Sequence, residues 1–197
     1  GQTTTVRAVF ATQTITLAQG WNLIGLTVGK GSNYLAEDFI RDLNASFIPS
    51  PNRRGTPLVN KVTQIVKWDS SRGRYMTHPK GSSTNNFPIV PGEGYFVIST
   101  WHGNSTISGT KASLSSLTIP RGYSMISFPQ LPSGVTTAED LLQSIQSQGI
   151  KVTQISRWFS GSWRVYNIGG SGIDFPLETG KGYMIRNIGQ EGNITVS

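Results

Sequence analysis

Apolar and polar residues alternate along much of the chain in short runs, and glycine-rich turns separate these runs. In the run KVTQIVKW (61–68), Val62, Val66 and Trp68 would lie on one face of an extended strand and the lysines on the other. Gln64 falls on the apolar face. Because a buried amide needs hydrogen-bond partners, we expect Gln64, and likewise Gln154 in the similar run KVTQISRW (151–158), to hold a neighbouring backbone segment in place.

Runs of this kind predict a strand-rich chain with tight reversals at glycine. We expect strands over 15–17, 21–28, 61–68, 95–99 and 106–108, and over 117–119, 123–128, 151–158, 183–187 and 194–196. Return strands that start at Tyr75 and Trp163 would complete two hairpins. A further extended segment, 3–10, is expected to pair with the exposed edge of a neighbouring subunit.

Two segments have instead the 3.6-residue period of an amphipathic helix. Their apolar faces consist of Leu35, Phe39, Ile40 and Leu43 in the first segment, and of Ala138, Leu141, Leu142 and Ile145 in the second. We expect the first helix to begin at Asn33 or Tyr34. The spacing of Thr136 and Glu139 matches a capping box at the start of the second helix.

Motifs of the first half recur in the same order in the second half, which predicts an internal duplication. GWNLIGL (20–26) matches GYSMISF (122–128), and KVTQIVKW matches KVTQISRW (151–158). The pair GEGY and GKGY follows in the same order. The repeated positions that we expect to be structural are Gly20, Trp21, Gln64, Trp68, Gly94 and Tyr95, with Gly122, Tyr123, Gln154, Trp158, Gly182 and Tyr183.

Each half contains several strands and one helix, so the expected fold class is mainly β, or α+β by element count. Each repeat would form a small β-barrel or β-sandwich, which its short helix plugs or flanks. We place an N-terminal extended strand at 1–12, the first repeat lobe at 13–110, a serine-rich joint at 111–116 and the second repeat lobe at 117–197. Because the joint is short, the lobes should touch.

The composition favours a folded, extracellular protein. Charged residues make up 14% of the chain, whereas about 25% is typical, and 5 Trp, 6 Tyr and 8 Phe provide core material. The chain has no cysteine, which excludes disulfides, thiol catalysis and thiolate metal sites. It has no apolar run near the roughly 20 residues of a membrane span, so we expect no membrane insertion. Since it begins with Gly1, we expect a processed product or a fragment.

Residues suited to catalysis do not form a recognisable set. His78 and His102 are the only histidines, and neither fits a metal-ligand spacing or has an obvious carboxylate partner. Asp174 and Glu178 are the remaining candidates for glycoside hydrolysis, although most acidic residues here are better explained by helix starts and turns. We therefore predict no catalytic residue, no metal site and no cofactor.

Aromatic and basic residues are the candidates for ligand binding. Those at repeated positions are expected to build the core, namely Trp21, Trp68, Trp158, Tyr95 and Tyr183. Aromatic residues near turns and strand ends could stack on sugars or bases with basic neighbours to assist them. This candidate set comprises Trp101, Tyr75, Trp163, Arg72, Arg74 and Arg164. The net charge is +7, with a local excess over residues 53–80.

Together, GWNLIGL, the two AED helix starts, VTQIVKW and GKGYMI resemble a repeat of secreted, multidomain bacterial and archaeal surface proteins. The resemblance covers nearly the whole chain twice and rests mainly on glycines and aromatic residues. It departs from the repeat at Gly25, where Ser is usual, and at Thr27, where the second half has Pro129. The resemblance implies an extracellular setting and supplies no catalytic residues.

We expect a non-enzymatic structural or adhesive module of a cell-surface or secreted assembly, with other surface domains or subunits as partners. One alternative is a carbohydrate-binding module that uses exposed aromatic residues to hold polysaccharide. A further alternative is a polyanion-binding module that uses the basic 53–80 stretch, with nucleic acid less favoured than acidic glycan.

Overall fold

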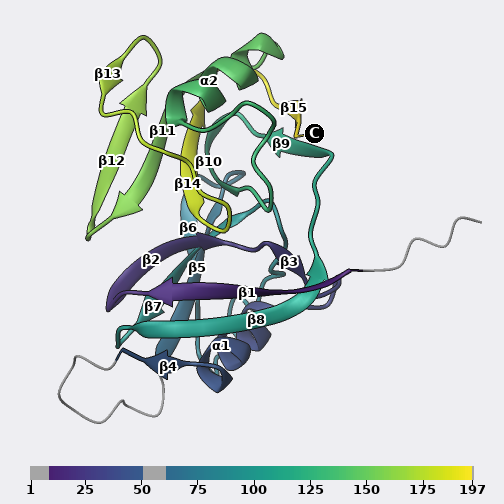
Figure 1. Ribbon diagram of the computed structural model, residues 1–197, viewed down its shortest axis with the longest axis vertical. Helices are drawn as coiled ribbons and strands as arrows, with labels where there is room; N and C mark the ends of the chain where they lie inside the picture. The colour runs from purple at the N-terminus through teal and green to yellow at the C-terminus, as the bar shows by residue number, and fades with distance from the viewer. Residues whose placement is uncertain (1–8, 51–60, 197) are drawn as a thin grey trace, which may run out of the picture.

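The computed structural model describes residues 9–50 and 61–196. The chain is mainly β, with antiparallel strands and two short helices in this part (Figure 1). The first group of elements is β1 (Phe10–Leu17), β2 (Gly20–Gly25), β3 (Val28–Gly29), α1 (Ala36–Ala45), β4 (Ile48–Pro49), β5 (Val62–Asp69), β6 (Arg74–Pro79), β7 (Gly94–Ser99) and β8 (Gly103–Lys111). The second group is β9 (Ser116–Ile119), β10 (Gly122–Ser127), α2 (Ala138–Ser147), β11 (Val152–Phe159), β12 (Ser162–Asn167), β13 (Ser171–Gly172), β14 (Gly182–Asn187) and β15 (Gly192–Thr195). We call these groups the first and second lobes; in Figure 1 they lie one above the other, with α2 in the upper and α1 in the lower.

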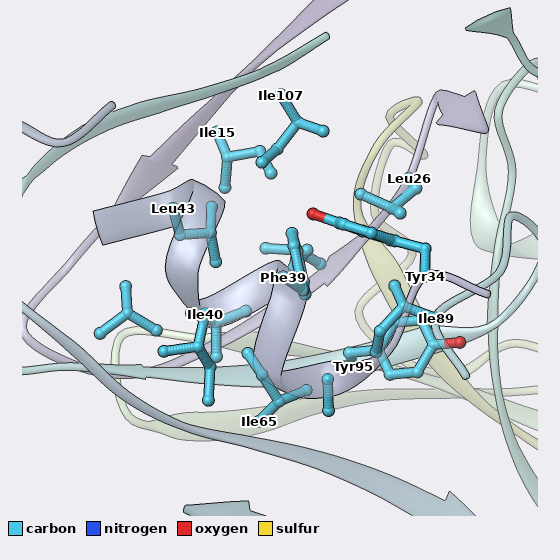
Figure 2. Packing of buried hydrophobic residues seen from close by; sticks show 14 of the residues in the cluster. Ile15, Leu26, Tyr34, Phe39, Ile40, Leu43, Ile65, Ile89, Tyr95 and Ile107 are labelled. Atoms are coloured by element: carbon cyan, nitrogen blue, oxygen red, sulfur yellow. The ribbon is translucent and has the colours of Figure 1, made fainter. Parts of the chain in front are cut away.

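The first lobe is a sandwich of two antiparallel sheets with α1 between them. One sheet has the order β2-β7-β5-β6, and the other has the order β1-β8-β3 with β4 also paired to β8. Figure 2 shows Ile15 and Ile107 on one side of α1, and Ile65 and Tyr95 on the other. All four side chains are at most 4% exposed, so the helix fills the space that the two sheets enclose.

The second lobe arranges its corresponding strands in the same order. Its larger sheet runs β10-β14-β11-β12-β13, and β9 pairs with β15. Leu17 pairs with Gly103 in the first lobe, and Ile119 pairs with Gly192 in the second. The β1–β8 ladder continues to Phe10 and Thr110, whereas the β9–β15 ladder is shorter.

The N-terminal strand runs across the boundary expected at residue 12, because β1 pairs with β8 from Phe10 onward. Most of the predicted 3–10 strand, together with Arg53 and Arg54, lies outside the described residues. The predicted start at Ile15 therefore missed the first half of β1.

The predicted helical faces are confirmed apart from the first residue of α1. Phe39, Ile40 and Leu43 are buried in α1, while Leu35 is the N-cap and only half-buried. The predicted start of α1 at Asn33 or Tyr34 was two or three residues too early, because the helix begins at Ala36. Its amino end is held by Asp38, whose Oδ2 accepts the Leu35 N–H at 3.1 Å, because a leucine side chain has no acceptor to offer.

The capping box of α2 lies one residue later than expected. Thr137, not Thr136, is the N-cap, and its Oγ1 accepts the Asp140 N–H at 3.2 Å. Asp140 Oδ2 accepts the N–H groups of Thr136 at 2.9 Å and Thr137 at 3.0 Å. These hydrogen bonds hold the pKa of Asp140 below its usual value. Glu139 instead bonds Gln143 within the helix.

A β-bulge overturns the simple alternation expected for residues 61–68. Val62 pairs with Ser99 but Gln64 pairs with Ile98, so the register shifts between them. Val62 and Ile65 consequently face the core of the first lobe, while Val66 faces the second lobe. The strand thus has apolar residues on both faces because both faces are covered.

The lobes pack through the outer faces of β2-β7-β5-β6 and β10-β14-β11-β12. Their shared apolar cluster consists of Leu23, Val66, Phe96, Met125 and Met184, with Trp68, Ile98, Trp158 and Trp163 packed against it. Figure 1 shows the two sheets meeting near the middle of the molecule. Each large sheet therefore has its own helix on one face and the other lobe on the opposite face.

Glycines allow the two backbones to touch. A Cβ at Gly94 would lie 3.0 Å from the Ile126 carbonyl oxygen, and one at Gly182 would lie 3.0 Å from that of Ile24. The Gly25 N–H donates to Gly180 O at 3.0 Å, and the Ser127 N–H donates to Gly92 O at 2.9 Å.

The contacts across the lobe interface are reciprocal. In the sequence alignment Gly25 corresponds to Ser127, so each lobe gives the other the same backbone hydrogen bond. The indoles do likewise: Trp68 Nε1 donates to Tyr123 O at 2.7 Å, and Trp158 Nε1 donates to Trp21 O at 3.0 Å. Such reciprocity is the pattern of a two-fold interface.

Replacing Gly25 with Ser should destabilise the protein, although Ser127 occupies the corresponding position. The new Cβ would collide with the Ser127 side chain, and we expect the free energy of unfolding to fall by about 2 kcal/mol. In the control Gly29→Ser, the nearest atom to the new Cβ is 3.9 Å away, so the change should stay within about 0.5 kcal/mol. Urea unfolding of both variants measures this; equal losses would contradict the backbone contact.

Acid should remove the contribution of Asp140 to stability. Its pKa is lowered in the folded chain, chiefly by the Thr136 N–H. The contribution is therefore present above the unfolded pKa near 4 and is lost as the pH falls through the lower folded value. Asp140→Asn should be less stable than the parent at pH 7 and indistinguishable from it at about pH 2. Chemical unfolding at both pH values tests this, and a difference that persists in acid would contradict it.

Candidate binding groove between the two lobes

Phe96 is the centre of an aromatic cluster that joins the lobes. Its ring lies 5.2 Å from Trp21, 5.5 Å from Trp158, 5.7 Å from Trp163 and 6.3 Å from Tyr75, measured between centroids. The two closest pairs are edge-to-face, the geometry that aromatic quadrupoles favour. Phe96 itself is 3% exposed, so the cluster is a second core at the lobe interface.

An open groove of about 310 Å³ lies on one side of this cluster. It is lined by Trp68, Tyr75, Tyr123, Gln154, Ser156, Trp163, Val165 and Met184. Trp68 and Tyr75 come from the first lobe, and the remaining residues come from the second. The groove therefore exists only when the lobes are packed together.

Contacts around Trp68 fix the positions of the aromatic rings at one side of the groove. Trp68 packs edge-to-face on Tyr75 at 4.9 Å and on Tyr123 at 6.5 Å, and its indole N–H is fixed by Tyr123 O. Tyr75 and Tyr123 remain 47% and 40% exposed. Partial burial raises the pKa of Tyr75, so its hydroxyl stays protonated at neutral pH. Two aromatic surfaces thus face solvent from fixed positions.

Two residues of the second lobe fill less space than their counterparts in the first lobe, and this leaves room for the groove. Ser156 occupies the position of Val66 in the alignment, and Met184 occupies that of Phe96. A serine and a flexible methionine leave space where the first lobe has a branched side chain and a ring. Polar groups enter there: Gln154 Nε2 donates to Ser156 Oγ at 3.3 Å, and Tyr123 Oη donates to Gln154 Oε1 at 3.5 Å.

The expected role of the repeated glutamines was wrong for Gln154, since its amide contacts side chains instead of a backbone segment. Asn44 performs that task in the first lobe, where its Oδ1 accepts the N–H groups of Lys61 at 2.9 Å and Val62 at 3.0 Å. Gln146 does so in the second lobe by donating to Val152 O at 2.8 Å. Both lie on the helices, outside the apolar faces.

The structure brings together only part of the candidate ligand set. Tyr75 and Trp163 both line the groove. Trp101 instead packs against the core of the first lobe, and its Nε1 is buried with no hydrogen-bond partner in the described part of the chain.

The candidate arginines are mostly engaged elsewhere. Arg72 binds Asp69 at 2.8 Å, and the Arg164 guanidinium lies 4.0 Å from the centroid of Phe159. Arg74 is exposed at the start of β6, next to Tyr75. The basic stretch is also partly neutralised, because Lys67 Nζ lies 3.1 Å from Glu93 Oε2.

Sequence reasoning misplaced the repeated tryptophans. Only Tyr95 and Tyr183 lie in the cores of the lobes, whereas Trp21 is 48% exposed. Trp68 and Trp158 pack between the lobes instead of inside them. The bulge places Val62 in the core of the first lobe and Trp68 on the opposite face, and no signal within the strand itself revealed this.

The two core tyrosines show what the G-x-G-Tyr motif does. The Val90 N–H donates to Tyr95 Oη at 2.9 Å, and the Glu178 N–H donates to Tyr183 Oη at 2.7 Å. Each hydroxyl thereby ties the loop before the turn to the sheet. Burial raises the pKa of Tyr183 to about 12.

His78 has a carboxylate partner that the sequence did not reveal. Its Nε2 lies 2.9 Å from Glu37 Oε2, and its Nδ1 lies 2.8 Å from Thr84 O. Both ring nitrogens face acceptors, so the ring satisfies both only when both carry a proton. Burial raises the pKa of Glu37, but hydrogen bonds from Gly81 and His78 outweigh this and lower it overall.

This pair is a structural tie for α1. His78 is completely buried, so no substrate can reach its ring. The corresponding residue of the second lobe is Tyr166, which interacts with Glu139 at the start of α2. Two different side chains therefore anchor the two helices at the same place.

The two carboxylates considered for glycoside hydrolysis have different surroundings. Asp174 Oδ1 accepts the N–H groups of Glu139 at 3.1 Å and Phe175 at 2.9 Å, so it caps α2. Glu178 is exposed near the lobe interface. Within residues 9–50 and 61–196, His, Asp and Glu form no cluster of three or more that could hold a metal ion.

Neither helix of the described chain has the length and apolar character of a membrane span. No family model, no curated protein and no solved structure matches the chain. The resemblance to repeats of surface proteins thus stays a prediction, and the groove has to be interpreted from its own chemistry.

Truncating Phe96 should weaken the contact between the lobes. Phe96→Ala removes the ring on which four other aromatic residues pack, and we expect the free energy of unfolding to fall by about 3–5 kcal/mol. Phe10→Ala is the control, because Phe10 is 81% exposed and its loss should cost less than about 0.5 kcal/mol. Thermal unfolding followed by tryptophan fluorescence provides the comparison, and a loss below 1 kcal/mol for Phe96→Ala would argue against the cluster as a second core.

Proposed function

We propose that this protein is a non-enzymatic adhesive module of a cell-surface or secreted assembly, and that it holds a carbohydrate chain in the groove between its lobes. The observation that carries the proposal is the convergence of four aromatic side chains from both lobes around the polar pair Gln154 and Ser156. Partners would include polysaccharide and the neighbouring domains or subunits of the assembly.

The chemistry of the groove suits a sugar. Aromatic rings pack against the apolar faces of pyranoses, and a few amide and hydroxyl groups can exchange hydrogen bonds with sugar hydroxyls. A volume of about 310 Å³ is at the lower end of the range for ligand sites. The groove is open to solvent, which suits a short stretch of a longer chain.

The order of strands supports descent of the two lobes from one duplicated unit. The β2-β7-β5-β6 sheet and the β10-β14-β11-β12 sheet place matched sequence motifs in matched positions. The reciprocal hydrogen bonds of Trp68 and Trp158 further support a pair of repeats that once associated as identical copies. In this proposal the groove arose where the copies later diverged.

The titratable side chains support a non-enzymatic role, because many of them make hydrogen bonds that stabilise the fold. Glu37 and His78 bind each other, and Asp38, Asp140 and Asp174 accept N–H groups at the helix starts. Each of these side chains contributes to the fold, in keeping with a scaffold that binds without reacting.

Removing an exposed ring of the groove should weaken glycan binding. Tyr75→Ala deletes a stacking surface, and we expect binding to neutral oligosaccharides to weaken by about tenfold or more, equivalent to about 1.4 kcal/mol. Tyr75→Phe is the matched control, since it keeps the ring and loses only the hydroxyl. A glycan array of neutral and acidic oligosaccharides, followed by calorimetry on the best binder, measures both variants. An array without hits for the parent protein, or equal binding by Tyr75→Ala, would refute the proposal.

A further inference from the structure

A second pocket between the lobes lies on the side of Trp158. It has a volume of about 190 Å³ and includes Trp21, Asn22, Arg157, Trp158 and Lys181 in its lining. None of these residues lines the aromatic groove. This pocket is therefore distinct from the aromatic groove.

The first-lobe counterpart of this pocket contains an ion pair. A smaller pocket of about 100 Å³ surrounds Trp68 and includes Lys67 and Glu93, whose charged atoms are 3.1 Å apart. In the aligned motifs, Lys67 corresponds to Arg157, and Glu93 of GEGY corresponds to Lys181 of GKGY. The second lobe thus replaces a cation and an anion with two cations.

Arg157 forms no ion pair with the described part of the chain. Its Nε is buried without a hydrogen-bond partner, and its guanidinium rests 5.0 Å from the ring centroid of Phe175 and 5.2 Å from that of Phe159. Among the described residues, no carboxylate lies within ion-pair distance of Arg157 or Lys181. These two rings hold the Arg157 guanidinium in one orientation, so the directions in which its N–H groups can donate are also fixed.

The net charge of the pocket favours a ligand with a single negative charge. Glu178 lies on its wall and is the only carboxylate that lines it, so two cations face one anion. Two neighbouring cations repel each other, and the buried Nε of Arg157 leaves the guanidinium without a full set of protein partners. A monoanion that approaches Arg157 and Lys181 would relieve the repulsion.

We propose that this pocket binds a carboxylate group. A planar guanidinium matches the two oxygens of a carboxylate, and Lys181 supplies a second charge beside it. The indole of Trp21, 48% exposed at the pocket, offers a surface to the carbon skeleton that carries the carboxylate. The proposal does not depend on glycan binding in the groove. The carboxylate can belong to a simple organic acid or to a uronic acid unit.

Indole N–H signals of the ¹⁵N-labelled protein provide the test, because Trp21 and Trp158 line the pocket. Sodium glucuronate, sodium acetate and glucose are titrated separately at low chloride concentration. We expect saturable shifts of these two indole signals with glucuronate and none with glucose. A response to acetate as well identifies a site for simple carboxylates, whereas a response to glucuronate alone assigns the site to uronic acids. No saturable shift with either carboxylate overturns the proposal.

Lys181→Glu tests whether the two cations are responsible. This change recreates the cation–anion pair that Lys67 and Glu93 form in the first lobe, so the fold should be retained and the affinity for glucuronate should fall at least about tenfold. Lys151→Glu is the matched control, since it changes the net charge equally at an exposed residue outside the pocket and should bind as the parent does. Unchanged binding by Lys181→Glu, or an equal loss in both variants, rejects the site. Circular dichroism verifies that both variants are folded.

Discussion

The close approach of two backbones, where the large sheets of the two lobes meet, is the constraint on which the rest of the structure depends. Gly94 and Gly182 lie where a Cβ would meet the other lobe's carbonyl oxygens, and paired backbone hydrogen bonds join the lobes through Gly25 and Ser127. Apolar and aromatic residues pack in the interface beside this contact, and the two pockets lie there between the lobes.

Residues shared by the lobes build the scaffold, and residues that differ between the lobes shape the two pockets that we propose as binding sites. Both lobes keep the tyrosine that ties loop to sheet and the tryptophan that donates to the opposite lobe. In contrast, Met184 stands where Phe96 fills the other side, and Lys181 stands where Glu93 closes an ion pair. If the lobes descend from one duplicated unit, as we propose, one copy could change while the other still held the interface.

Local patterns in the sequence predicted most of the elements, because periodicity and turn glycines act over a few residues. The faces of α1 and α2 and the strands that begin at Gly94 and Gly182 are examples. The bulge after Val62 was not predictable in this way, since it depends on pairing with β7, which is distant in sequence.

The candidate site was only half predictable for a related reason. Tyr75 and Trp163 were chosen because they stand at strand starts, and they do line the groove. Trp68 and Tyr123 were assigned to structural positions, yet they form the other part of its lining. Whether a repeated aromatic residue faces its own lobe or the neighbouring one depends on how the lobes pack, and a pattern within one repeat carries no information about that.

The paired backbone hydrogen bonds also determine how any ligand must enter. Many two-lobed proteins trap a ligand by hinge closure, which needs a connection that can flex. Here the lobes are joined by backbone hydrogen bonds through Gly25 and Ser127 and by indole hydrogen bonds from both sides. Preformed, solvent-open surfaces of this kind favour rapid exchange, so lasting attachment would have to come from many weak contacts along one polymer, not from slow release at a single closed site.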